Sequence, residues 1–244
     1  MLSQELCSVI ELALDENHLS GNHDELNTNT HLTIRNTRPD DISKIILLQE
    51  ISFPYLAKYG NIWHREELES HIRIFPQGQF VAVEHDGTVV GSASTLIISL
   101  TPEYAEHTWC KVTADGLFTN HNPNGDSLYG ADISSHPKYR HEGIGTMLYG
   151  ARKELTIKYA LKRMIAGGRL YNYCEHAGIM SPLEYAHEVV AGRIHDPVLS
   201  FELDNGFKFI KILPNYLTDV RSLNYASFIE WKNPHITAVA SMLK

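Results

Sequence analysis

The segment from Arg140 to Gly145, with the sequence RHEGIG, has the residue types of an anion-binding turn at the start of a helix. Gly143 and Gly145 have no Cβ, so the backbone can turn tightly and approach a ligand closely. The first amides of a helix have no carbonyl partner within it, and the helix dipole places about half a positive charge at that end. The sequence therefore predicts a phosphate or pyrophosphate site at this turn.

The residues around the turn exclude two common kinds of phosphate-binding site. Residues 128–135 read as a strand, Pro137 marks a turn, and the amphipathic pattern predicts a helix over about 143–160. A Rossmann site needs GxGxxG and a P-loop needs GxxxxGK[ST], and neither spacing occurs here. A glycine pair before a helix can also serve only to pack the helix against a strand, so the turn alone leaves both interpretations open.

Ile133-Ser134-Ser135-His136-Pro137, followed by Arg140, Gly143 and Gly145, resembles the acyl-CoA site of the GNAT superfamily of N-acetyltransferases. In that superfamily a strand and a His-Pro turn lead to [QR]xxGx[GA] and a helix. The downstream run Leu203–Phe207, LDNGF, resembles the late xxxGF turn of the same superfamily.

The resemblance covers most of the chain, from about residue 31 to residue 234. Longer strings, among them LKRMIAGGRLYNY and MSPLEYAHEVV, resemble the GNAT domain that is often fused to nitrilase-type carbon-nitrogen hydrolases. We expect no such hydrolase domain here, because only ten residues follow Pro234. The resemblance implies an α/β fold with a mixed, mostly antiparallel central sheet flanked by helices. The implied divisions are a helical extension and linker over 1–30, the GNAT domain over 31–234 and a tail over 235–244.

The resemblance also implies acetyl-CoA as the cosubstrate. Its pantetheine arm would lie along the end of the predicted strand, and its pyrophosphate would lie on the turn that follows. The residues implied for the pantetheine are Ile133, Ser134 and Ser135, and those implied for the pyrophosphate are Arg140, His141, Glu142, Gly143, Ile144 and Gly145.

The activity implied by the resemblance is direct transfer of an acetyl group to a primary amine of a small molecule or a protein. A second class of function stays open, a non-catalytic acyl-CoA-binding module that regulates or partners another enzyme. Many GNAT enzymes carry a general-acid Tyr four residues before the glycine of the late turn, and here that position is Glu202.

Three carboxylates are candidates for proton transfer. Asp132 lies beside the end of the cofactor strand and could act as a base through water, or could point to solvent. Glu84 ends the first strand of a predicted hairpin, where it could be catalytic or could merely flank the turn. Glu202 is the third candidate, because of its position in the resemblance.

Tyr171 and Tyr173 are candidates for an acceptor-binding role, because they follow the glycine pair at 167–168, although aromatic residues there can equally be structural. Residues 101–127 have few apolar repeats and read as a long loop. This loop could cover the acceptor site or be a surface excursion.

The remaining pattern predicts the elements that position these residues. The DG turn at 86–87 between two β-rich runs is a hairpin signal. Predicted strands are 31–36, 80–84, 89–99, 163–168, 207–213 and 222–231, and predicted helices are 39–51, 65–74 and 182–191.

Composition bounds the class of protein. At 244 residues, with 43% hydrophobic and 20% charged residues, the chain can bury one substantial core, and its net charge of −8 argues against nucleic-acid binding. No apolar run approaches the roughly 18 to 20 residues of a membrane span, so we expect a cytoplasmic protein with no membrane contact.

The sequence argues against a metal site. His64 and His71 would lie about 10 Å apart along a helix, and the sequence has no HExxH motif. The sequence leaves open whether the protein forms a homodimer.

Overall fold

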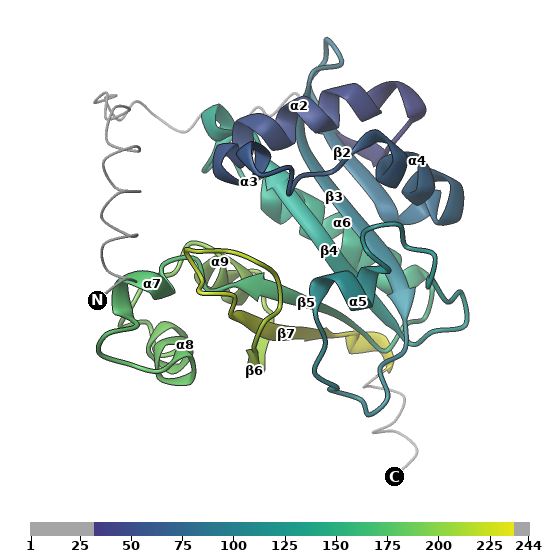
Figure 1. Cartoon of the computed structure of the whole chain (residues 1–244). Helices are drawn as coiled ribbons and strands as arrows, with labels where there is room; N and C mark the ends of the chain where they lie inside the picture. The colour runs from purple at the N-terminus through teal and green to yellow at the C-terminus, as the bar shows by residue number, and fades with distance from the viewer. Residues whose placement is uncertain (1–31, 237–244) are drawn as a thin grey trace.

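A computed structural model describes residues 32–236, which contain a seven-stranded mixed sheet (Figure 1). The order across the sheet is β1-β2-β3-β4-β5-β7-β6, and every described neighbouring pair is antiparallel except β4 and β5. The predicted mixed, mostly antiparallel sheet is therefore confirmed. The strands are β1 (Thr33–Asn36), β2 (Gln79–Val83), β3 (Val89–Ile98), β4 (Ser127–Ser135), β5 (Arg163–Arg169), β6 (Lys208–Leu213) and β7 (Ala226–Lys232).

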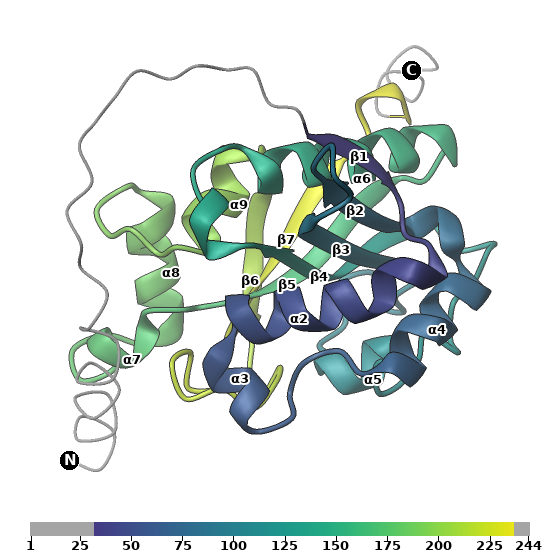
Figure 2. The ribbon, with the colours of Figure 1, turned by 90° about the horizontal axis from the view of Figure 1, so that it is seen from above.

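Helices cover both faces of the sheet, as Figure 2 shows. We call the two faces the α6 face and the α2 face. Helices α6 (Ile144–Lys158) and α9 (Leu199–Asp204) lie on the first, and α8 (Pro182–Val190) packs into the same apolar cluster. The α2 face carries α2 (Ile42–Ser52), α3 (Pro54–Lys58), α4 (Arg65–Ile74) and α5 (Trp109–Thr113). The remaining short elements are α7 (Tyr173–His176) and the 3-10 turns η2 (Pro39–Asp41), η3 (Pro76–Gly78) and η4 (Pro137–Tyr139).

Strand alternation divides the core into two apolar clusters, one on each face. Leu128 of β4 and Met164 of β5 point into the cluster under α6, whereas their neighbours Tyr129 and Ile165 point into the cluster under α2. Successive side chains of a strand point to opposite faces, so the face of a residue follows from its position, except across the irregularity in β4 between Gly130 and Asp132. This parity decides which side of the sheet each candidate residue reaches.

The predicted strands and longer helices are all present, with ends within a few residues of the expected ones. The sequence pattern missed α3, α5, α7 and α9, because a helix of four to six residues is too short to show a helical period. Residues 101–127, expected to be a loop, contain α5 and are therefore partly helical. The predicted extension over 1–30 lies outside the described residues.

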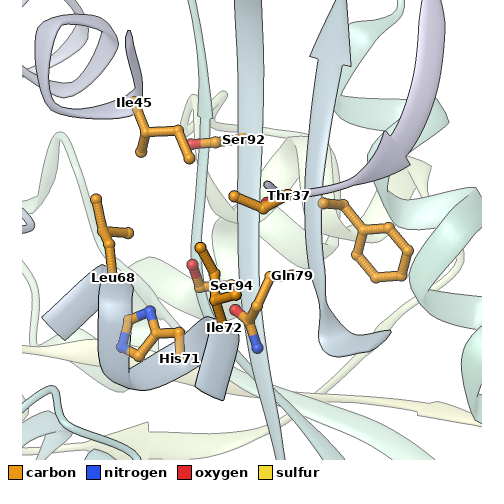
Figure 3. A pocket seen from close by; sticks show the side chains of 9 residues that line it. Thr37, Ile45, Leu68, His71, Ile72, Gln79, Ser92 and Ser94 are labelled. Carbon is orange, nitrogen blue, oxygen red and sulfur yellow. The ribbon is translucent and has the colours of Figure 1, made fainter. Parts of the chain in front are cut away.

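His71 of α4 is a structural residue buried among rings, only 1% exposed. It is stacked on Phe118 with ring centroids 3.6 Å apart, and its Nε2 lies 2.6 Å from the carbonyl oxygen of Gly116. A carbonyl only accepts, so Nε2 carries the hydrogen. Figure 3 shows His71 at the edge of a cavity of about 10 Å³ between α2, α4 and the sheet, too small for a ligand. Burial lowers the pKa of His71 to about 4.

This burial predicts a loss of stability in mild acid. Unfolded His71 gains a proton near pH 6.5, whereas the folded protein resists it down to about pH 4. The stability that neutral His71 provides is therefore complete above pH 6.5 and is lost as the pH falls toward 4, by up to about 3 kcal/mol. Urea unfolding at pH 7.5, 6 and 5 measures it. His71→Gln should be less stable at neutral pH but show a weaker pH dependence, and an unchanged slope would contradict the assignment.

Candidate functional site

Strands β4 and β5 pair over only four residues and then separate. The pairing runs from Ser127 opposite Arg163 to Gly130 opposite Ala166. Beyond these residues β4 stays paired with β3 and β5 stays paired with β7. The facing edges of residues 131–135 and 167–169 thus have no strand partner in the described sheet, and we call this opening the splay. It is visible between β4 and β5 in Figure 1.

A β-bulge lies at the base of the splay. Asp132 is opposite Ser94 and Gly130 is opposite Thr95, so Ala131 is an extra residue in β4. Bulges bend a strand and redirect its side chains. The buried Arg152 of α6 holds the bulge in place, because its Nη2 donates to the carbonyl oxygens of both Ser94 and Asp132.

The predicted anion-binding turn follows the splay directly. After η4, His141 and Gly143 take left-handed φ values of 71° and 79°, and α6 begins at Ile144. The first main-chain bond of α6 runs from the amide of Met147 to the carbonyl of Gly143. The amides of residues 144–146 therefore precede the helical hydrogen bonds and are free to meet an anion. We call residues 140–146 the cradle.

The two glycines of the cradle have different physical roles. A Cβ on Gly143 would touch nothing within 4 Å, so its left-handed φ is what favours glycine there. A Cβ on Gly145 would lie 2.5 Å from the ring of Phe201 on α9, so this glycine is needed for packing. Gly145 therefore serves packing, against helix α9 and not against a strand, whereas Gly143 serves the backbone conformation of the turn.

The predicted pantetheine segment is anchored to α2. Gln49 donates to the Ser134 hydroxyl at 3.1 Å, and the Ser52 hydroxyl donates to the Ser135 carbonyl at 3.1 Å. The Ile133 side chain packs against the cluster on the α6 face. The end of β4 is thus rigidly held on its α2 side, while its edge toward β5 faces the splay.

Glu84 lies at the cradle rather than at the splay. It follows β2, which is separated from β5 by two strands, and its Oε2 accepts a hydrogen bond from the Tyr139 hydroxyl at 2.8 Å. Because Tyr139 belongs to η4, this contact fixes the turn that leads into the cradle. The geometry therefore gives Glu84 an anchoring contact and does not bring it to Asp132.

Asp132 enters the splay from the α2 face. Its Oδ2 accepts a hydrogen bond from Gln49 at 2.9 Å, and the residue is partly exposed. Burial raises the pKa of Asp132 above its ordinary value, although the charge of Arg152 opposes this. A raised pKa makes the carboxylate a stronger base.

Glu202 of α9 approaches the splay from the α6 face. It is 4% exposed, its carboxyl lies directly against Gly168 of β5, and the Ser227 hydroxyl donates to Oε2 at 3.3 Å. Burial raises the pKa of Glu202 well above its ordinary value. A raised pKa favours the protonated form of the carboxyl, which can then serve as an acid.

The two candidate carboxyl groups lie just beyond the last paired residues of β4 and β5. Asp132 is two residues beyond Gly130, and Gly168 is two residues beyond Ala166, the last paired residues of the two strands. Asp132 comes from one face of the sheet and Glu202 from the other. A reacting group held in the splay would have a candidate base on one face of the sheet and a candidate acid on the other.

The structure separates the two predicted acceptor-site tyrosines. The partly exposed ring of Tyr171 lies between the guanidinium groups of Arg169 and Arg221, at 5.6 Å and 4.7 Å. Tyr173 is 4% exposed and packs in the core, where its hydroxyl donates to the carbonyl of Met180. Tyr171 is thus available near the end of β5, whereas the environment of Tyr173 is that of a packing residue.

An open cavity of about 330 Å³ lies on the α2 face beside the cradle. It combines exposed apolar side chains of α2 with polar groups of the β2–β3 turn, and it adjoins the residue that precedes η4. Its lining residues are Lys44, Leu47, Leu48, Ile51, Asp86, Gly87, Thr88, Val89 and His136.

Residues 32–236 contain neither a metal-binding cluster nor a membrane-spanning helix. In that part of the chain no three His, Cys, Asp or Glu side chains come close enough together to hold a metal ion. Its helices include none that combines the length and the apolar character needed to cross a bilayer.

Sequence reasoning missed Gln49, which contacts both Asp132 and Ser134 across more than 80 residues of chain. It also missed Tyr216, which packs on Gly167 with its hydroxyl 2.7 Å from where a Cβ would lie. The adjacent glycines at 167–168 were the available signal for Tyr216, because each leaves room for a side chain from elsewhere in the chain.

Comparison with known proteins places this geometry among related chains. A family model described as "Acetyltransferase (GNAT) family" matches residues 46–173, from α2 through the cradle and β5. The matched segment therefore includes both strands of the splay.

Two relatives come from Bacillus subtilis strain 168. "Uncharacterized N-acetyltransferase YkwB" is 42% identical over 202 residues, which cover 83% of this chain and 89% of the relative. "Probable hydrolase YhcX" is 46% identical over 203 residues, which again cover 83% of this chain but only 39% of the relative. The chain thus spans well under half the length of YhcX.

A solved structure of a more distant protein has the same fold. It is titled "GphF GNAT-like decarboxylase in complex with isobutyryl-CoA" and matches with a TM-score of 0.65 at 22% identity, over 82% of this chain and 99% of that one. At this identity the likeness concerns the fold alone. That protein binds an acyl-CoA on a fold of this kind.

Proposed function

This chain belongs to the acetyltransferase (GNAT) family, and we propose that it transfers an acetyl group from acetyl-CoA directly to a primary amine of a small molecule or a protein. The observation that carries the proposal is the continuity of the splay with the cradle. The unpaired edge of β4 runs straight into the turn whose amides precede the first helical bond of α6.

The described residues fit acetyl-CoA. The amides of residues 144–146 and the left-handed turn at Gly143 would hold the pyrophosphate, with no Cβ in the way. The edge of β4 from Ile133 to Ser135 would offer its main-chain groups to the pantetheine arm. The thioester would then lie near the bulge, between Asp132 and Glu202.

The chemistry needs proton transfers that these two residues could perform. The amine attacks the thioester carbon, the C–S bond breaks, and acetyl-CoA supplies the acetyl group. Asp132 would accept a proton from the attacking nitrogen, and Glu202 would give its proton to the departing thiolate. Each such transfer contributes typically 10²- to 10⁴-fold to a rate.

We also propose that this chain is similar to the GNAT portion of proteins that carry a nitrilase-type hydrolase. The partial match to "Probable hydrolase YhcX", 39% of its length, supports this relation. A non-catalytic acyl-CoA-binding module is the alternative function. Release of CoA thiol in the presence of a panel of primary amines separates the two, because a module would bind acetyl-CoA without releasing thiol.

Thr146→Glu tests the cradle. Acetyl-CoA at about 100 times its dissociation constant should stabilise the wild type by about 2.7 kcal/mol, visible as a rise in melting temperature. Thr146 is exposed in the first turn of α6, so a carboxylate there would occupy the free amides and repel pyrophosphate. Helix N-termini accept acidic residues well, so the variant should fold, and the shift should be lost.

Thr119→Glu is the matched control, because Thr119 is exposed, precedes β4 at the opposite end from the cradle and undergoes the same change of charge. It should keep the full acetyl-CoA shift. A full shift in Thr146→Glu would rule out the cradle as the binding site. The absence of any shift in the wild type would overturn the proposed function itself.

A further inference from the structure

A chain of three buried titratable side chains lies on the α2 face beside the splay. Tyr216 and Tyr129 have their hydroxyl oxygens 2.7 Å apart, and the Tyr129 hydroxyl lies 3.0 Å from Nε2 of His107. All three are at most 8% exposed. The proton transfers assigned above to Asp132 and Glu202 do not use this chain.

The hydrogens in this chain are ordered in one direction. Nδ1 of His107 lies 2.9 Å from the carbonyl oxygen of Ala105, which can only accept, so Nδ1 carries the hydrogen. In a neutral imidazole Nε2 must then accept, and Tyr129 donates to it. Because the Tyr129 hydrogen is used in that bond, Tyr216 must donate to Tyr129. Every hydrogen of the chain thus points toward His107.

The other end of this row of side chains lies beside the start of the splay. Tyr216 packs against Gly167, which is the first residue of β5 beyond the last pair with β4. Burial raises the pKa of both tyrosines, while the nearby main chain of Gly167 acts in the opposite sense. Since Tyr216 gives its own hydrogen to Tyr129, its oxygen keeps lone pairs that can accept a proton, and this oxygen lies beside Gly167 of β5.

Acetyl transfer leaves a proton unaccounted for by Asp132 and Glu202. An ammonium acceptor loses two protons on the way to an amide, of which one is balanced by the leaving thiolate and one must reach solvent. Asp132 can hold only one proton at a time. A second path would let an acceptor that arrives protonated react before Asp132 has released a first proton.

We propose that Tyr216, Tyr129 and His107 form a proton relay that carries the first proton of the acceptor ammonium from the splay to His107. An N–H bond of the ammonium breaks and its proton binds the Tyr216 oxygen. The Tyr216 hydrogen moves to Tyr129, and the Tyr129 hydrogen moves to Nε2, which leaves a free amine and an imidazolium. Rotation of the hydroxyls restores the chain after His107 releases a proton. This inference rests on the proposed transferase function.

The surroundings of His107 suit a transient proton carrier. Burial lowers its pKa, and so do the charges of Lys211 on β6 and Lys111 on α5, while the Ala105 carbonyl acts in the opposite sense. Lys211 is itself paired with Glu106 at 3.6 Å. His107 is therefore neutral at pH 7 and would give up an acquired proton readily. It retains 8% exposure, through which the proton can leave.

Two amines that differ in protonation test the relay. Benzylamine is an ammonium at pH 7, whereas aniline is already neutral. Tyr216→Phe and Tyr129→Phe should lower kcat/KM for benzylamine by about 100-fold and leave the value for aniline within about twofold. Raising the pH should bring benzylamine transfer by these variants closer to the wild-type rate at the same pH, because the amine then deprotonates in solution. Equal losses for both amines, or no loss for either, would overturn the relay.

Tyr104→Phe is the matched control. It also removes a tyrosine hydroxyl on this side of the sheet, one that donates to Glu230 at 3.0 Å. It leaves all three side chains of the relay in place. The ratio of the two amine rates should stay at the wild-type value. A purely structural role of the tyrosines would change both amine rates together and would not be rescued by pH.

A measurement without any acceptor amine tests the direction of the hydrogen bonds in the relay. The ¹⁵N spectrum of His107 at pH 7 should show a neutral ring protonated at Nδ1, and an Nε2-protonated ring would overturn the relay. This readout also separates two failures. If acetyl-CoA gives no thermal shift and no thiol is released, the proposed function fails, whereas a normal wild-type enzyme with an unchanged Tyr216→Phe variant removes only the relay.

Discussion

Glu202→Gln is expected to lower kcat for acetyl transfer by about 10²- to 10⁴-fold while leaving the acetyl-CoA thermal shift intact. Glutamine has nearly the same shape as a protonated glutamate and can accept the same hydrogen bond from Ser227. It should therefore keep the packing against Gly168. What it lacks is the proton that the leaving thiolate needs.

Kinetics of CoA thiol release measure this effect, with Glu154→Gln as the control. Glu154 is exposed on α6 and makes no hydrogen bond or ion pair within the described residues, so its variant should react at the wild-type rate. In the wild type the rate should fall at high pH, as Glu202 loses its proton above its raised pKa. An unchanged kcat in Glu202→Gln, or a wild-type rate that does not fall at high pH, would remove Glu202 as the acid.

The cradle could be predicted from the sequence because its physics is local. Ten adjacent residues, 137–146, contain a proline, a left-handed turn and the first turn of a helix. Each of these features favours particular residue types that can be recognised in the sequence. The long strands and helices were predictable for the same reason. A period of two or of 3.6 residues needs no knowledge of distant parts of the chain.

The splay could not be predicted in this way, because its walls come from distant segments. The glycines at 167–168 read only as a break after a strand. In the structure Tyr216 fills the space over Gly167 on one face, and Glu202 fills the space over Gly168 on the other. Which side chain occupies the space left by a glycine depends on the order of strands and on α9, which is too short to show a pattern.

The sequence could not decide toward which face of the sheet Asp132 points. A shift of one residue in the pairing register moves every side chain of a strand to the opposite face. The bulge at Ala131 makes such a shift within β4 itself. As a result Tyr129 and Asp132, three residues apart, both reach the α2 face, which strict alternation would forbid. The bulge thus brings the candidate base and the tyrosine chain to the same side of the sheet.

Asp132→Asn is the matching test of the base, with an expected loss of about 10²- to 10⁴-fold in kcat/KM for a primary amine. Asparagine can still accept the hydrogen bond from Gln49, so the bulge and the acetyl-CoA thermal shift should persist. Asp126→Asn provides the control, because Asp126 immediately precedes β4, at the end away from the cradle, and pairs with Lys162 near the surface. Losing that pair should cost at most about 1 kcal/mol of stability and no activity.

The pH dependence of the rate tests whether Asp132 acts as a base. A base works only when ionised, so wild-type activity should rise with pH through the raised pKa of Asp132, and this part of the profile should vanish in Asp132→Asn. If the relay removes the first proton and Asp132 the second, Asp132→Asn should slow benzylamine and aniline alike, whereas Tyr216→Phe should slow benzylamine alone. Equal behaviour of the two variants would mean that a single path carries both protons, and full activity in Asp132→Asn would leave the nitrogen without this base.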